Sequence, residues 1–172
     1  MGVEKYMTTT KKIVRIAIFA CILFCQEQLL SFIPNVQFTQ CLIAIFYLAF
    51  GLPETLLMIV VHVLLDNLIM GSLSLMYTPA MLVGWMTLPL ILHLLKSIKN
   101  KWVISAIVGL HGILYSLCFA FTQCLLLEVP FISYVIADIP FTIILIVNGF
   151  VTTFILLEPC VKVLRRLAKK EG

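Results

Sequence analysis

Apolar residues fill six long runs of the chain, and short polar segments separate these runs. The runs cover residues 12–32, 36–50, 54–70, 79–95, 102–127 and 133–164. A helix needs roughly 20 mostly apolar residues to cross about 30 Å of hydrocarbon. Proline or glycine follows the end of several runs, as at Pro34, Gly51 and Gly71. The pattern therefore predicts an all-α membrane protein, with six transmembrane helices in one compact domain over residues 1–172.

The second run is shorter than the others. At about 1.5 Å per residue, a helix over 36–50 is only about 23 Å long. Such a segment crosses comfortably only where the membrane is thin or where neighbouring helices shelter it.

Composition narrows the possible classes of protein. Of the 172 residues, 62% are hydrophobic and 12% are charged, and the mean hydropathy is +1.14. Soluble domains average roughly 45–50% apolar and about 25% charged residues. A core of this size does not hide so much apolar surface, so most of it must face lipid. Disordered chains, nucleic-acid-binding proteins and soluble enzymes are therefore disfavoured.

The twelve lysines and arginines occur in three regions: before the first run, between the fourth and fifth, and after the sixth. They are Lys5, Lys11, Lys12, Arg15, Lys96, Lys99, Lys101, Lys162, Arg165, Arg166, Lys169 and Lys170. With six crossings these regions share one side, which the positive-inside rule makes cytoplasmic, together with both termini. The outer connections at 31–37, 71–78 and 128–133 contain no basic residue. We interpret the last cluster as an orientation signal, with an anionic-lipid site as the alternative.

The six cysteines form no CxxC pair and are scattered through the apolar runs. This pattern indicates small hydrophobic side chains, and no disulfide, metal site or cofactor is expected. The first run follows Lys11, Lys12 and Arg15 as in a signal peptide, but no small-x-small cleavage site follows it. We therefore expect an uncleaved first span.

Four acidic residues belong to the outer half of the predicted bundle or to its rim. They are Glu27, Asp66, Glu128 and Asp138. Charged groups at membrane depth cost about 2.5–3.5 kcal/mol each on insertion scales, so those that persist usually face protein, a cavity or a partner. No lysine or arginine lies in that half, so we expect no internal salt bridge. Each carboxylate must be protonated, hydrated, bonded to neutral donors or matched by a bound cation.

Two of these acids have simple explanations near the membrane surface. Glu128 is expected in interfacial water. Asp138 lies near the predicted start of the sixth helix, two residues before Pro140, and we interpret it as a helix cap, with a binding role as the alternative.

The other two acids lie deeper. Glu27 stands between Gln26 and Gln28, and three consecutive polar residues spread over about 200° of a helix, so at least one of them faces the interior. Asp66 shares a helix face with His62. This spacing fits either a histidine–carboxylate pair or a hydrogen bond that serves packing alone.

Aromatic and amide side chains extend this polar group. His111 and Tyr115 lie one turn apart on the fifth predicted helix, Trp85 lies on the fourth, and Asn35 and Gln37 lie at the first outer connection. An apolar pocket with aromatic walls and a few convergent polar groups suits a small flat ligand. For Trp85, a place in the aromatic belt of the membrane interface is the alternative. The candidate substrate-binding residues are Glu27, Asn35, Gln37, Asp66, Asn67, Trp85, His111, Tyr115 and Asp138.

Small residues form a second candidate feature on the first predicted helix. Ala17 and Cys21 stand four residues apart, with Ala20 beside them. Such faces let another helix approach closely in lipid, although this spacing is common in helical bundles. These three residues are the candidate partner-docking residues.

Together, the chain length, six predicted helices and cytoplasmic termini resemble the substrate-binding S components of energy-coupling factor (ECF) vitamin transporters. That family docks its coupling subunit through an Ala-xxx-Ala patch on helix one, which would correspond to Ala17 and Cys21, with cysteine replacing the second alanine. The family's first outer loop, which closes over the ligand, would correspond to residues 31–40. Its metal-type members carry an N-terminal histidine motif that Met1-Gly2-Val3 lacks, so nickel or cobalt is not expected.

The resemblance implies a multi-pass protein of the prokaryotic cell membrane that captures a small solute from outside. A separate transmembrane coupling subunit and two ATPase subunits would drive delivery, since this chain has no GxxxxGK[ST] phosphate loop. Outer acids without basic partners favour a neutral or cationic aromatic micronutrient over an anionic vitamin. Thiamin-like, pyridoxamine-like and amine-bearing deazapurine compounds fit equally well.

Two other classes remain open. A multispan scaffold, similar to MreD-type cell-shape proteins, explains the length and topology and would make the outer polar residues structural. An intramembrane enzyme is the third class, with His62 and Asp66, or His111 and Glu27, as acid–base pairs. No nucleophile in a recognised setting and no metal-ligand spacing is present, so no catalytic residue is assigned.

Overall fold

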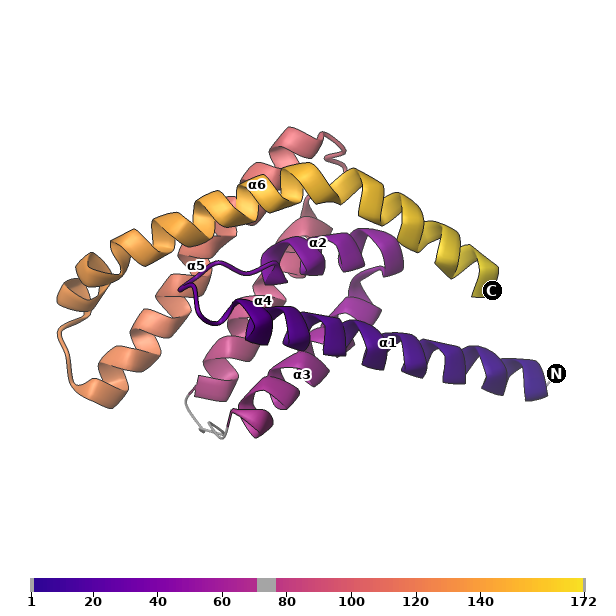
Figure 1. The fold of residues 1–172 in the computed structure, drawn as a ribbon, viewed down its shortest axis with the longest axis horizontal. Coiled ribbons are helices and arrows are strands. Elements are labelled where there is room, and N and C mark those ends of the chain that lie inside the picture. Colours follow the sequence, from indigo (N-terminus) through magenta and orange to yellow (C-terminus); the bar gives the residue numbers. More distant parts are fainter. Residues whose placement is uncertain (1, 71–76, 172) are drawn as a thin grey trace.

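The computed structural model describes residues 2–70 and 77–171, and within these ranges every regular element is an α-helix. The helices are α1 (Gly2–Leu30), α2 (Thr39–Phe50), α3 (Leu52–Ile69), α4 (Tyr77–Leu94), α5 (Lys101–Leu127) and α6 (Phe131–Glu171). The all-helical prediction is confirmed, although α1 and α6 extend further toward the termini than predicted. Most of the predicted 71–78 connection lies outside the described residues. Both termini lie at the same end of the molecule in Figure 1.

Five of the described helices are long and apolar enough to cross a membrane. These five spans are Thr9–Leu30, Leu52–Ile69, Tyr77–Leu94, Lys101–Leu126 and Phe131–Ala168. Their outer faces carry large exposed apolar side chains, and Leu29, Leu94 and Ile132 have 73%, 81% and 73% of their surface exposed. Surfaces of this kind are stable against lipid tails and not against water. The chain is therefore a membrane protein.

The remaining helix, α2, lies in the centre of the molecule. Its 12 residues form only about 18 Å of helix, and it packs against all five other helices. Its buried residues are Thr39, Gln40, Cys41, Ile43, Ala44, Ile45, Phe46 and Tyr47. A helix that is apolar on every side is stable when protein surrounds it. The short second run is thus sheltered by its neighbours.

Local sequence signals explain where α2 ends and α3 begins. Gly51 has a φ of +88°, a conformation that favours glycine, and its N–H donates to the carbonyl of Tyr47 at 2.9 Å. Pro53 occupies the first turn of α3, where its missing N–H removes no helical hydrogen bond. The chain therefore turns directly from α2 into α3.

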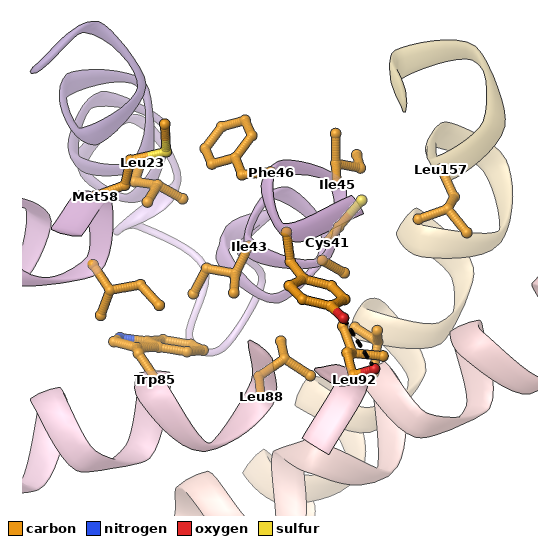
Figure 2. Packing of buried hydrophobic residues seen from close by; sticks show 14 of the residues in the cluster. Leu23, Cys41, Ile43, Ile45, Phe46, Met58, Trp85, Leu88, Leu92 and Leu157 are labelled. Atoms are coloured by element: carbon orange, nitrogen blue, oxygen red, sulfur yellow. Dashed lines mark hydrogen bonds between the residues drawn. The ribbon is translucent and has the colours of Figure 1, made fainter. Parts of the chain in front are cut away.

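The hydrophobic core forms around α2, as Figure 2 shows. Ile43 and Phe46 of α2 are almost completely buried between Leu23 of α1, Trp85 of α4 and Leu157 of α6. Burial of such side chains contributes about 1.5–3 kcal/mol each in water, whereas inside a membrane close packing supplies most of the stabilisation. The core thus ties helices that are distant in sequence to one central element.

The longest helix, α6, has 41 residues and contains Pro140 and Pro159. A proline inside a helix removes a backbone hydrogen bond and bends the helix. Figure 1 shows this bend, with the last, yellow part of α6 turned toward α2. There Arg165 donates from Nε and Nη2 to the carbonyl oxygen of Leu48, at 3.1 and 2.8 Å. The basic end of α6 therefore caps one carbonyl group, that of Leu48, in the last turn of α2.

Candidate functional site

A cavity of about 470 Å³ lies at the end of the molecule that carries the α1–α2 and α5–α6 connections. Its wall is formed by the end of α1, the α1–α2 connection and parts of α3, α5 and α6. The cavity brings together six of the nine predicted binding residues. They are Glu27, Asn35, Gln37, Asp66, Tyr115 and Asp138. Whether they bind a solute stays a prediction.

The carboxylates of Glu27 and Asp66 line one side of this cavity. Gln28 Nε2 donates to Asp66 Oδ1 at 2.8 Å, which joins α1 to α3. Glu27 Oε2 lies 3.2 Å from Nε2 of the fully buried His62, in an orientation that makes no hydrogen bond. The predicted pairing of His62 with Asp66 is therefore not the closest one. The histidine–carboxylate contact joins His62 to Glu27 instead.

This contact also corrects the expectation of no internal salt bridge in the outer half. His62 supplies a positive charge beside Glu27 whenever its imidazole is protonated. It lies behind the carboxylate and is not part of the cavity wall. Among the described residues that line the cavity, none is lysine or arginine. The wall itself thus presents carboxylates without a resident cation.

The α1–α2 connection is held over the cavity by side chains from both neighbouring segments. Gln26 Oε1 accepts from the N–H of Phe38 at 2.7 Å, and Gln26 Nε2 donates to Thr39 Oγ1 at 2.6 Å. Asn148 Nδ2 donates to the carbonyl of Gln37, which fixes the connection to α6. Asn35 has a φ of +57°, a conformation that asparagine tolerates better than most residues. The connection is therefore an ordered wall.

Aromatic rings form another side of the cavity. Tyr115 and Phe119 lie one turn apart on α5, with ring centroids 4.9 Å apart, and both line the cavity. Trp85 stacks against Tyr115 at 4.0 Å between ring centroids. Trp85 is completely buried, so it supports the wall from behind and is not an exposed belt residue. Tyr134 of α6 adds a further ring.

Asp138 reaches the cavity from α6, but it does not cap the helix. The helix begins at Phe131, seven residues before Asp138, so the cap interpretation is wrong. Asp138 Oδ2 instead accepts from Thr142 Oγ1 at 2.9 Å, and the same hydroxyl lies 2.8 Å from Ser116 Oγ. Its carboxylate is the third one in the cavity wall.

Three predicted binding residues lie outside this cavity. Asn67 bonds within the bundle, where its amide accepts from Thr78 Oγ1 at 3.0 Å, and Trp85 is covered as described. His111 lies 3.0 Å from the carbonyl of Gly84 and 2.9 Å from Thr87 Oγ1. Both of these contacts are made by Nε2, which joins α5 to α4, whereas Nδ1 lies 3.5 Å from Nε2 of Gln40 on α2. The structure pairs Glu27 with a different histidine, His62.

Several cavity residues escaped the sequence prediction. They are Gln28, Ser116, Phe119 and Tyr134. A helical spacing of four was the available signal, since Phe119 follows Tyr115 and Tyr134 precedes Asp138 by one turn. Gln28 belongs to the three consecutive polar residues of which at least one was expected to face the interior. Ser116 follows Tyr115 directly, and only the packing of the helices selects it.

The candidate docking residues divide between two environments. Ala17 and Cys21 are exposed on the outer face of α1, whereas Ala20 is completely buried. Ala20 therefore packs within the chain itself and does not belong to the exposed small-residue face.

Comparisons with known proteins add no relative. No protein-family model, curated protein or solved structure matches the chain. Within the described residues, no group of three or more histidine, cysteine or acidic side chains is placed to hold a metal ion. The function must therefore be argued from the geometry of the cavity.

Proposed function

We propose that this protein is a membrane-embedded subunit that binds a small cationic aromatic solute in the 470 Å³ cavity. The observation that carries the proposal is the cavity wall, where three carboxylates face a space that no lysine or arginine of the wall shares. Burying a carboxylate without a counter-charge is costly, so a bound cation is favoured at this place. The function is capture of the solute.

The size and the lining of the cavity support a small ligand. Sites for small molecules usually have volumes of about 300–1,000 Å³ and combine apolar walls with a few polar groups. Here Tyr115 and Phe119 offer ring faces for an aromatic body, and Glu27 and Asp66 offer acceptors for an ammonium group or a ring cation. An anionic vitamin would meet these carboxylates unfavourably.

Transport would follow from the resemblance to ECF S components. In that arrangement the cavity faces the cell exterior, and the basic connection and both termini face the cytoplasm. A coupling subunit would dock on α1 at Ala17 and Cys21, which are exposed, and two ATPase subunits would supply the energy. The protein would then reside in a prokaryotic cell membrane and catalyse no reaction of its own.

Ligand binding is tested on the detergent-purified protein with thiamine and pyridoxamine as cationic aromatic probes. We expect submicromolar binding of one of them by native mass spectrometry and titration calorimetry. Glu27→Gln and Asp66→Asn should each weaken it about tenfold, as loss of one charge-assisted contact predicts.

The matched control is Glu128→Gln, because Glu128 is an exposed acid at the same end of the molecule and does not line the cavity. This variant should bind as the unchanged protein does. Equal affinity in all three variants would contradict the proposal. Retention of neither probe, together with co-purification of cell-shape proteins, would favour the scaffold.

A further inference from the structure

A second cavity, of about 610 Å³, lies at the opposite end of the molecule from the acidic one. It opens between the α4–α5 connection, the start of α5 and the basic part of α6 that follows the bend. Six cationic side chains line it, with one carboxylate, that of Glu158. The cations are Lys96, Lys99, Lys101, Lys162, Arg165 and Arg166. The charge of this lining is therefore opposite in sign to that of the first cavity, whose wall carries carboxylates.

Only two of the six cationic side chains form an ion pair, a cation–π contact or a hydrogen bond with described residues. Lys101 Nζ lies 3.7 Å from Glu158 Oε2 and 4.2 Å from the centre of the Phe154 ring. Arg165 caps α2 through Leu48. Among the residues that the structure describes, the other four form no ion pair or hydrogen bond. Four like charges around one cavity repel one another unless an anion lies between them.

The inner surface of this cavity is apolar. Ile98 and Ile104 come from the α4–α5 connection and α5, and Leu157 and Val161 come from α6. A soluble anion gains nothing from such a floor, whereas a lipid brings a phosphate for the rim and hydrocarbon for the floor. Basic pockets between transmembrane helices at the positive side of a membrane bind lipid headgroups in this way.

We propose that this cavity binds the phosphate headgroup of an anionic phospholipid. The cationic rim contacts the phosphate oxygens, and the glycerol and the first part of the acyl chains lie against the apolar floor. The basic cluster after the sixth run then has a binding role in addition to the orientation role predicted from the sequence. This site is separate from the proposed solute cavity and does not depend on it.

Lipid selection is tested with protein released from nanodiscs that contain equal amounts of phosphatidylglycerol, cardiolipin and phosphatidylcholine. Native mass spectrometry should show retained phosphatidylglycerol or cardiolipin in preference to phosphatidylcholine. Lys99→Gln with Arg166→Gln should lower that preference about tenfold or more, because each cation near the surface contributes to binding of anionic lipid. A second pair, Lys96→Gln with Lys162→Gln, should act in the same direction.

The control pair is Lys11→Gln with Lys12→Gln, which removes two positive charges from α1 outside this cavity. It should leave the lipid preference unchanged. An equal loss of preference in the control pair would show that general surface charge is responsible and would overturn the proposal. Binding of inorganic pyrophosphate to the delipidated protein, with no preference among the lipids, would overturn it in favour of a soluble phosphate ligand.

Discussion

Arg15 and Glu54 form a bidentate ion pair between α1 and α3. Arg15 Nε and Nη2 donate to Glu54 Oε2 at 3.0 and 2.8 Å, and Nη2 also lies 3.0 Å from Oε1. Their side chains are only 12% and 17% exposed, and the guanidinium lies 4.9 Å from the centre of the Phe50 ring. The planar fork of arginine matches a carboxylate in a way that lysine does not. Arg15 is therefore a structural residue as well as a part of the basic N-terminal region.

Removal of this arginine should destabilise the protein. Arg15→Met leaves the Glu54 carboxylate poorly exposed and without its partner, which should lower the free energy of unfolding by about 2 kcal/mol. Chemical unfolding in mixed micelles measures the change. Lys12→Met, at an exposed position on the same helix, should have almost no effect. Adding Glu54→Gln to Arg15→Met should restore part of the loss, and a loss equal to the sum of the single changes would contradict the pairing.

At the level of single residues, the candidate site was partly predictable. Glu27 and Asp66 were identifiable because uncompensated acids in a membrane segment usually face protein or a cavity. The places of His111 and Trp85 were not, because one bonds to a backbone carbonyl and the other lies behind Tyr115. Both contacts form between α4 and α5, so the sequence of either helix alone does not predict them.

Among the helices, α5 and α6 pack closely through glycines. A Cβ atom added at Gly109 would lie 2.8 Å from the backbone oxygen of Ile146, while one added at Gly112 would lie 3.3 Å from the flexible side chain of Leu145. Small residues at such contacts let helix backbones approach in lipid. The two positions therefore differ in how easily the neighbour moves.

Alanine substitutions should separate the two positions. Gly109→Ala should lower the free energy of unfolding by about 2 kcal/mol, because α6 must move away from α5. Gly112→Ala should cost less than about 1 kcal/mol, since a side chain yields and alanine favours the helix. Unfolding in mixed micelles measures both variants. Equal stability losses would show that the close approach at Gly109 does not control this packing.

The helices were more predictable than their arrangement. The apolar runs 36–50, 54–70 and 102–127 located α2, α3 and α5 within a few residues. Gly51 and Pro53 marked the boundary between α2 and α3, whereas the cap that Asn100 forms at the start of α5 is seen only in the structure. The central position of α2 was not evident, since an apolar run looks the same whether lipid or protein surrounds it. The start of α6 at Phe131 lies two residues from the start of the predicted run at 133, and only the interpretation of Asp138 as a helix cap was wrong.

Across the whole molecule, opposite charges collect at opposite ends. One end has the acidic cavity, and the other has the basic cavity and the chain termini. By the positive-inside rule we expect the basic end to face the cytoplasm. The two proposed ligands, a cationic solute and an anionic lipid, would therefore reach the protein from different sides.

Site-directed labelling tests this orientation. In a variant without other cysteines, Glu128→Cys should react with a membrane-impermeant maleimide in intact cells, because residue 128 lies at the α5–α6 connection. Ser97→Cys, in the α4–α5 connection, should react only after the membrane is opened. Both positions are exposed, so access alone decides the result. The reverse labelling pattern would contradict the orientation and the capture of a solute from outside.

The central position of α2 has a consequence for how the chain is assembled as the ribosome makes it. α2 packs against α6, which is synthesised after the other described helices, and the buried Gln40 and Thr39 belong to α2. Before α6 is inserted, the unfinished protein contains α2 without its main neighbour. α2 is only about 18 Å long, which is too short for the bilayer, and it carries polar side chains. Completion of the described fold thus waits for α6, which closes around a segment made long before it.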